Sequence, residues 1–111
     1  NGAALTTGDG KAYFTIPAEL NTKNIVSVAA SLTTTSSSGI PTVQIANITD
    51  LVDLLSTALT IDASELTSYT ATTPAVIDAT KDDVATGDLL RIDVDVAGTG
   101  AKGLQVTIGF R

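Results

Sequence analysis

The sequence predicts an all-β fold: an antiparallel, jelly-roll-like β-sandwich with about 7–8 strands and at most one short helical turn. Short segments in which apolar residues occupy every second position recur along the 111-residue chain. Glycine, proline and aspartate separate these segments at short intervals, as they do in turns between strands. Most of the apolar residues are small or β-branched, and threonine and serine fill much of the remainder, which favours strands over helices.

The chain is long enough for one domain, which we place at 11–111, behind a flexible N-terminal arm at 1–10. Small and turn-forming residues dominate the arm, and we expect Gly8, Asp9 and Gly10 to form the turn that closes it. A domain of this size buries roughly two-thirds of its unfolded surface, so a core can form without a disulfide or a metal.

The first half of the domain alternates clearly between apolar and polar positions. We predict a strand at 11–16, ended by Pro17, because proline cannot donate a hydrogen bond to a neighbouring strand. A second strand is expected at 24–34 and a third at 41–49, with a loop rich in serine and glycine between them. The residues of the second strand expected to point into the core are Val26, Val28, Ala30 and Leu32.

The segment that follows supports two interpretations. Leucines at helical spacing come after a possible N-cap, but apolar residues further along alternate at strand spacing. We therefore predict a short helical turn near 50–54 and a strand at 55–61. A short threonine-rich strand at 66–72, an extended piece at 75–77 and an acidic loop at 78–88 are expected next.

The clearest pair of strands lies in the C-terminal part of the chain, at 89–96 and 104–110. In both strands apolar residues alternate, and antiparallel pairing places all of them on one face, so the register is strongly determined. We therefore predict a hairpin in which the segment AGTGAKG connects the two strands. The charged residues of this hairpin, which we expect to face solvent, are Arg91, Asp93 and Asp95.

The composition excludes several classes of chemistry. The chain has no histidine and no cysteine, so Ser-His-Asp and Cys-His catalysis, disulfides and thiolate zinc sites are impossible. Its net charge is −6 and its six basic residues occur singly, which disfavours binding to nucleic acid or to an anionic membrane surface. No apolar run approaches the roughly 20 residues of a membrane span. We expect a protein that is not an enzyme.

One group of carboxylates is a candidate for metal binding. Closely spaced hard oxygen ligands in a loop are what Ca²⁺ prefers. The spacing matches no EF-hand, and the alternative is a solvated turn in which aspartates accept hydrogen bonds from backbone N–H groups. A pair of these carboxylates acting as in a glycosidase is disfavoured, because few aromatic residues are available to stack on a sugar. The candidate calcium ligands are Asp78, Asp82, Asp83 and Asp88.

The chain has only two tyrosines and two phenylalanines. Alternation assigns Phe14 and Phe110 to the core, which leaves Tyr13 and Tyr69 as the aromatic side chains that could contact a ligand. By its phase in the first strand, Tyr13 points outward, where it could stack on a sugar or pack against a neighbouring subunit. A partly buried tyrosine with no ligand is the simpler interpretation.

The segments PAVID, DDVATGD, LRIDVD and KGLQVTIGF resemble a family of small proteins and C-terminal domains of tailed bacteriophages. The N-terminal segment TTGDGKAYFTIPAELNTKNIVSVAAS is similar to the same family, so the resemblance covers nearly the whole chain after the arm. The resemblance implies a β-sandwich displayed on a virion, in the manner of capsid decoration (cement) proteins or the heads of fibres. It implies no catalytic residue.

Several expectations follow from this resemblance. The protein would be made in the host cytoplasm, located on the surface of the phage particle and assembled as a homo-oligomer, with a trimer favoured. Its partners would be the major capsid protein or another virion protein, and it would need no cofactor. A short chain fits capsid decoration better than a fibre, which needs a long shaft. The alternative is a tail-fibre or receptor-binding head that recognises carbohydrate on the host surface.

Overall fold

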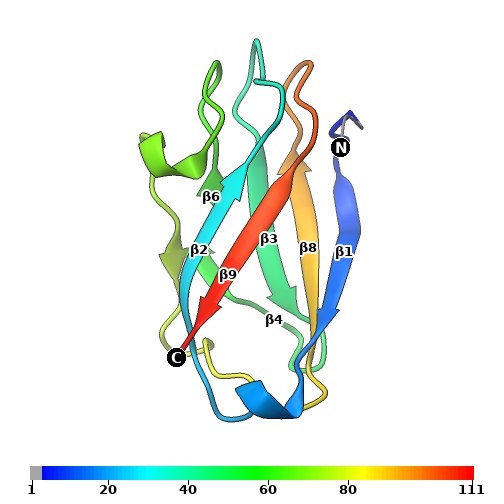
Figure 1. Ribbon diagram of the computed structural model, residues 1–111, viewed down its shortest axis with the longest axis vertical. Helices are drawn as coiled ribbons and strands as arrows, with labels where there is room; N and C mark the ends of the chain where they lie inside the picture. The colour runs from blue at the N-terminus through cyan, green and yellow to red at the C-terminus, as the bar shows by residue number, and fades with distance from the viewer. Residues whose placement is uncertain (1–3) are drawn as a thin grey trace.

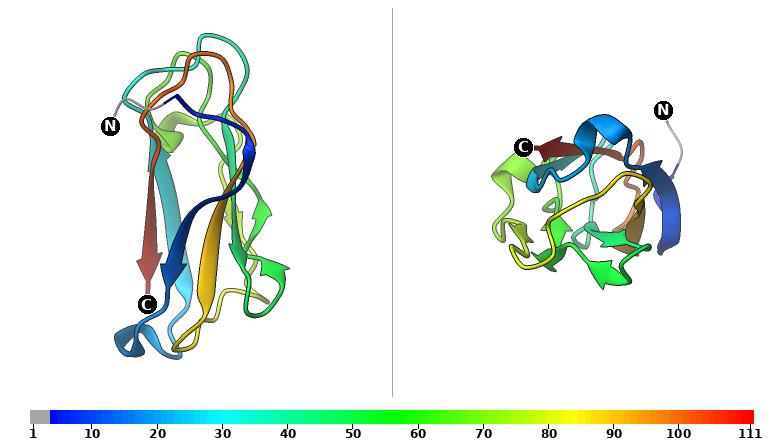
Figure 2. Two further views of the ribbon diagram at one scale, coloured as in Figure 1. Left: turned by 90° about the vertical axis from the view of Figure 1, so that its right-hand side faces the viewer. Right: turned by 90° about the horizontal axis from the view of Figure 1, so that it is seen from below.

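The computed structural model describes residues 4–111, and its strands form two facing layers (Figures 1 and 2). The larger layer, sheet I, has the order β1-β8-β3-β4, and β6 also pairs with β3. Its strands are β1 (Gly8–Thr15), β8 (Leu89–Val96), β3 (Thr42–Asn47), β4 (Val52–Asp53) and β6 (Leu59–Thr60).

The second layer, sheet II, contains only two strands. They are β2 (Ile25–Ser31) and β9 (Gln105–Phe110), paired antiparallel. A third small sheet pairs β5 (Leu55–Thr57) with β7 (Val76–Ile77). Every pair of strands is antiparallel, so the prediction of an all-β antiparallel sandwich is confirmed, with nine strands among the described residues.

The core lies where the two sheets face each other. Val43 and Ile45 of β3 and Leu90 of β8 are almost completely buried, opposite Ile25 and Ala30 of β2. Burying one such aliphatic side chain stabilises a fold by roughly 1.5–3 kcal/mol. The two layers are therefore held together by aliphatic packing across the sandwich, with little contribution from aromatic residues.

Each end of the sandwich is fixed by a buried polar side chain. At one end, Asn47 donates to Asp88 Oδ2 (3.1 Å) and Asp50 Oδ2 (3.2 Å), and it accepts a bond from the Asp50 N–H. At the other end, the Ser36 hydroxyl donates to a backbone carbonyl of the 38–39 segment and accepts from the Thr99 N–H. Because both side chains are fully buried, these bonds prevent the cost of an unpaired polar group.

The predicted hairpin of 89–96 and 104–110 is wrong in its pairing, although both strands exist. β8 lies between β1 and β3 in sheet I, while β9 pairs with β2 in sheet II. The segment between them crosses from one layer to the other (Figure 1). An alternating pattern shows which face of a strand is apolar, but it does not distinguish a neighbour in the same sheet from a neighbour across the core.

Three other predictions were wrong because the backbone departs locally from regular strands and helices. Val26 is 45% exposed rather than inward, because the ladder between β2 and β9 shifts register between Ile25 and Ser27. The expected helical turn at 50–54 is instead a tight turn followed by β4, with Leu51 at a φ of 58°. The expected strand at 66–72 contains a 3-10 turn, η2 (Ser68–Thr70), whose Ser68 hydroxyl accepts the Ala30 N–H.

Two further predictions were partly wrong. The expected strand at 55–61 is divided into β5 and β6. A second 3-10 turn, η1 (Ala18–Leu20), follows Pro17, so the described chain has two short helical turns rather than one.

No helix within residues 4–111 has the length and apolar character needed to cross a membrane.

Residues 4–10 of the predicted arm at 1–10 make contacts with the rest of the fold. Gly8, Asp9 and Gly10 belong to β1 rather than to a closing turn. Upstream of them, the Leu5 N–H donates to the Ala101 carbonyl at 2.9 Å, which ties this segment to the loop before β9. The first three residues of the predicted arm lie outside the described residues.

The loop contact between Ser36 and Gly98 gives a stability prediction. Gly98 has a φ of 69°, and a methyl group there would collide with the Ser36 side chain. We expect Gly98→Ala to lose about 1–2 kcal/mol more than Gly100→Ala, because Gly100 also has a positive φ but faces open space. Urea unfolding of the two variants measures the difference. Equal losses would show that the Ser36 contact is unimportant.

Candidate functional site

The open side of the sandwich is its most unusual surface. Sheet II ends at β9, whereas sheet I continues beyond β8 to β1, so no strand of sheet II covers β1 (Figure 2). Within the described chain, β1 pairs only with β8 and β9 only with β2. The outer edges of β1 and β9 therefore keep backbone N–H and C=O groups that no strand pairs with, which is the usual condition for adding another strand.

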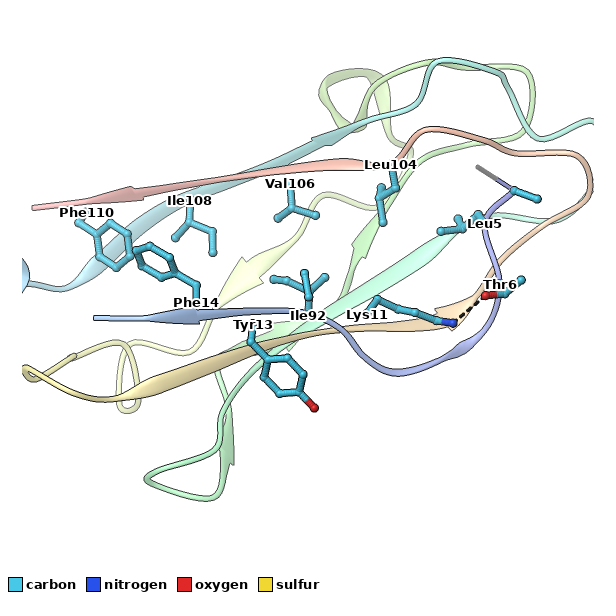
Figure 3. A pocket seen from close by; sticks show the side chains of 12 residues that line it. Leu5, Thr6, Lys11, Tyr13, Phe14, Ile92, Leu104, Val106, Ile108 and Phe110 are labelled. Carbon is cyan, nitrogen blue, oxygen red and sulfur yellow. Dashed lines mark hydrogen bonds between the residues drawn. The ribbon is translucent and has the colours of Figure 1, made fainter. Parts of the chain in front are cut away.

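A groove of about 480 Å³ lies between these two edges (Figure 3). Its walls are mainly aliphatic and aromatic, since side chains of β9 point down toward those of β1 and β8. The lining residues are Ala4, Leu5, Thr6, Lys11, Ala12, Tyr13, Phe14, Ile92, Leu104, Val106, Ile108 and Phe110. We call this feature the β1/β9 groove.

Two contacts close the ends of the β1/β9 groove (Figure 3). At one end the rings of Phe14 and Phe110 pack with their centroids 6.3 Å apart. At the other end Leu5 points into the groove beside Leu104, and the Lys11 ammonium donates to the Thr6 hydroxyl at 2.6 Å. Between these ends the groove is open.

The groove explains why inward-pointing residues of β1 and β9 are exposed, which the alternating pattern alone did not predict. Phe14 and Phe110, both assigned to the core from the sequence, point inward but are not covered, and Phe14 remains 42% exposed. The inward side chains Val106 and Ile108 of β9 are likewise only partly buried. These residues lack a covering strand, so their apolar surface stays in contact with water.

A polar network on the outer face fixes β1 beside the groove. Opposite Asp93, β1 bulges between Gly8 and Ala12, and the Gly10 N–H donates to Asp93 Oδ1 at 3.0 Å. Arg91 binds the same carboxylate with two bonds of 2.7 and 3.0 Å. Asp93 therefore provides the acceptor that the β8 backbone cannot offer to the bulged residues.

The charged residues of β8 were predicted to face solvent, and this prediction is wrong for Asp93, the central one. Asp93 is only 4% exposed, whereas Asp95 is exposed as expected. Hydrogen bonding to Asp93 raises the pKa of Arg91, against the opposing effect of burial. Burial raises the pKa of Asp95, and the nearby carboxylates of Asp93, Asp9 and Asp53 raise it further.

The four candidate calcium ligands have separate structural roles. Asp88 is buried and accepts bonds from Asn47 and from the Ala85 N–H. Asp78 accepts two bonds from Thr80, which together with Lys81 lower its pKa.

The backbone carbonyl of Asp82 accepts the Ile25 N–H, and Asp83 forms an isolated β-bridge with Asn24. No three acidic side chains come together in a metal-binding arrangement within residues 4–111. Calcium binding by this loop stays a prediction that only a measurement with the ion can test.

The two tyrosines lie in different settings. Tyr13 is 61% exposed and points outward as predicted, and its ring packs against Gly10 at the margin of the β1/β9 groove. Tyr69 is 81% exposed on η2, and it is not among the residues that line the groove. A sugar-stacking site that used both rings together is therefore not formed.

A smaller hollow of about 340 Å³ lies beside Arg91 and Asp53. It also contacts Leu51, the exposed residue at the strained turn between β3 and β4. The side chains of its buried polar members are already paired, as Asn47 is with Asp50 and Asp88. We therefore regard the β1/β9 groove as the candidate functional site.

Comparisons of the chain with protein families, with characterised proteins and with solved structures gave no significant match. The functional argument therefore depends on the groove and on the residues around it. Sequence reasoning missed the groove because it paired β9 with β8, which would have closed this side of the sandwich.

The anchoring role of Asp93 gives a second prediction. We expect Asp93→Ala to lower the free energy of unfolding by about 2–3 kcal/mol, because it leaves the Gly10 N–H without its acceptor and leaves Arg91 with only the 3.7 Å ion pair to Asp9. Asp95→Ala is the matched control, two residues along the same face, and should not destabilise the fold. Denaturant unfolding measures both, and equal effects would contradict the anchoring role.

The raised pKa of Asp95 predicts a pH dependence. An acid whose pKa is raised on folding costs stability once the unfolded state ionises, so this cost develops as the pH rises through about 3.9 toward the folded pKa. We expect Asp95→Asn to be slightly more stable than the wild type at pH 7. At pH 3 the gain should disappear, and urea midpoints at the two pH values test this; an equal gain at both would contradict it.

Proposed function

We propose that the protein is a non-enzymatic structural component on the surface of a tailed-phage particle, most consistent with a capsid decoration or cement protein. The observation that carries the proposal is the β1/β9 groove, in which apolar side chains and two free strand edges are exposed together. Such surfaces are typical of protein–protein contacts rather than of solvent-facing sheets. The placement on a phage particle depends on the resemblance of segments such as KGLQVTIGF.

The arrangement of polar groups supports a structural role over a catalytic one. The chain lacks histidine, and its buried carboxylates, Asp88 and Asp93, are used to hold loops and strands together. All buried side-chain N and O atoms within residues 4–111 have a hydrogen-bond partner.

Immunogold labelling of intact virions tests the proposed location. Antibodies against the purified chain should label the shell of the particles evenly. Label confined to the tail tip would contradict the decoration role and favour the carbohydrate-binding alternative. Absence of label from purified particles, with label on the free protein as a control, would contradict a virion function altogether.

Self-association stays a separate proposal. Light scattering on the purified chain compares its mass with that of the 11.2 kDa monomer. We expect a trimer, because the resemblance to virion-associated proteins of tailed phages implies one. A monomeric mass at every concentration would contradict this expectation without affecting the labelling experiment.

A further inference from the structure

Half of the basic residues of the chain lie in two segments that contribute most of the lining of the β1/β9 groove. The segments 10–18 and 96–111 contain Lys11, Lys102 and Arg111 but no acidic residue. All 12 acidic residues of the chain lie outside these two segments, together with only three basic ones. These two segments are therefore basic in a strongly acidic protein, although Asp9 of β1 and Asp93 and Asp95 of β8 lie next to them.

One of the three basic residues lines the groove, the other two flank β9, and none of them forms an ion pair within residues 4–111. Lys11 lines the groove, Lys102 precedes β9 and Arg111 follows it. The ion pairs within residues 4–111 involve Lys81 and Arg91, and none of them involves these three residues. Positive charge thus lies in one wall of the groove, at Lys11, and just beyond each end of β9, at Lys102 and Arg111.

The shape of the groove fits a single strand. Neighbouring strands lie about 4.8 Å apart and packed sheets about 10 Å apart, so one strand added to the edge of β9 would lie over β1. Its alternate side chains would then meet Phe14 and Ile92 below and lie beside Val106 and Ile108. These four side chains are apolar, so they favour apolar residues at every second position of the added strand.

The N-terminal segment of the chain already pairs with the residues just before β9. Ala4 forms an antiparallel bridge with Lys102, the Leu5 N–H bonds to the Ala101 carbonyl, and the Leu5 side chain points into the groove. Beyond this short contact, no strand within residues 4–111 lies beside the β9 edge from Gln105 to Phe110. The backbone is therefore accessible to a neighbouring strand, but the described chain fills only one end.

We propose that the β1/β9 groove binds an extended segment of another protein chain, which adds as a strand to the free edge of β9. The segment has apolar side chains at alternate positions and carboxylates toward its ends, where they meet Lys11, Lys102 and Arg111. This inference rests on the proposed structural function and names the chemistry of the partner. A second copy is disfavoured, because antiparallel pairing of two β9 edges would bring Lys102 of one copy toward Arg111 of the other.

A capped synthetic peptide of roughly seven residues tests the proposal, with valine and threonine alternating and an aspartate at each end. It is titrated into the ¹⁵N-labelled full chain at low ionic strength, and the amide resonances are followed by NMR. We expect saturable shifts at 104–110 and in β1. A peptide with lysines at its ends should bind on the order of tenfold more weakly, because each exposed charge pair contributes up to about fivefold.

Variants test separately the contribution of charge and the contribution of apolar contact to peptide binding. Lys102→Glu combined with Arg111→Glu should weaken the acidic peptide on the order of tenfold, while Lys23→Glu, the same change away from the groove, should not. Val106→Asp should abolish binding, and Val26→Asp, at an exposed valine of the neighbouring strand, is its control. The charge variants lie on the surface, so they remain informative if Val106→Asp does not fold.

Three results would overturn the proposal. Shifts outside the groove, or none at millimolar peptide, would show that no such strand binds there. Equal affinity for the acidic and basic peptides would remove the charge argument. Broadening of the 104–110 resonances as protein concentration rises, without peptide, would identify a second copy as the occupant. Each result leaves the virion-labelling test untouched, so failure of this inference and failure of the proposed function are distinguishable.

Discussion

The structure depends on a mismatch in width between its two layers. Sheet I has four strands in a continuous row, and the two strands of sheet II cover only part of it. Where they overlap, aliphatic residues such as Ile25 and Leu90 are fully buried, and this overlap stabilises the fold. Where they do not overlap, the same alternation of apolar residues leaves Phe14 and Val106 partly exposed. The core and the groove are thus two parts of one apolar surface, one covered and the other not.

The polar network around Asp93 maintains β1 in its exposed position. An edge strand with an uncovered face has few apolar contacts to hold it, so it needs another source of order. The bonds from Gly10 and Arg91 to a buried carboxylate provide it, at a bulge that also interrupts the regular edge of β1. Bulges and charged residues commonly protect edge strands from indiscriminate pairing. The ladder between β9 and β2 shifts register only between Ile25 and Ser27 of β2, at one end of β9. The backbone of β9 is therefore more regular than that of β1.

The sequence predicts the class of fold and most strands, because the faces of β3, β8 and β9 alternate cleanly. It does not predict which strands are neighbours, since the inward faces of β8 and β9 fit equally well side by side or across a core. The burial of Asp93 is also not predictable from the sequence, because a carboxylate in an alternating strand normally lies on the solvent-exposed face. Its burial depends on Gly10, which is far away in sequence. The groove follows from strand pairing, so no local pattern could reveal it.

The charge distribution connects solubility with selectivity at the open edge. An apolar groove beside two free strand edges invites aggregation unless something opposes contact between copies. The net charge of −6 provides long-range repulsion, and the like charges of Lys102 and Arg111 disfavour antiparallel pairing of two β9 edges. The same cations attract a strand that carries carboxylates, because they have no acidic partner within the described chain. One arrangement of charges can therefore both reject a second copy and select an acidic partner, which is how natural interfaces gain specificity beyond apolar contact alone.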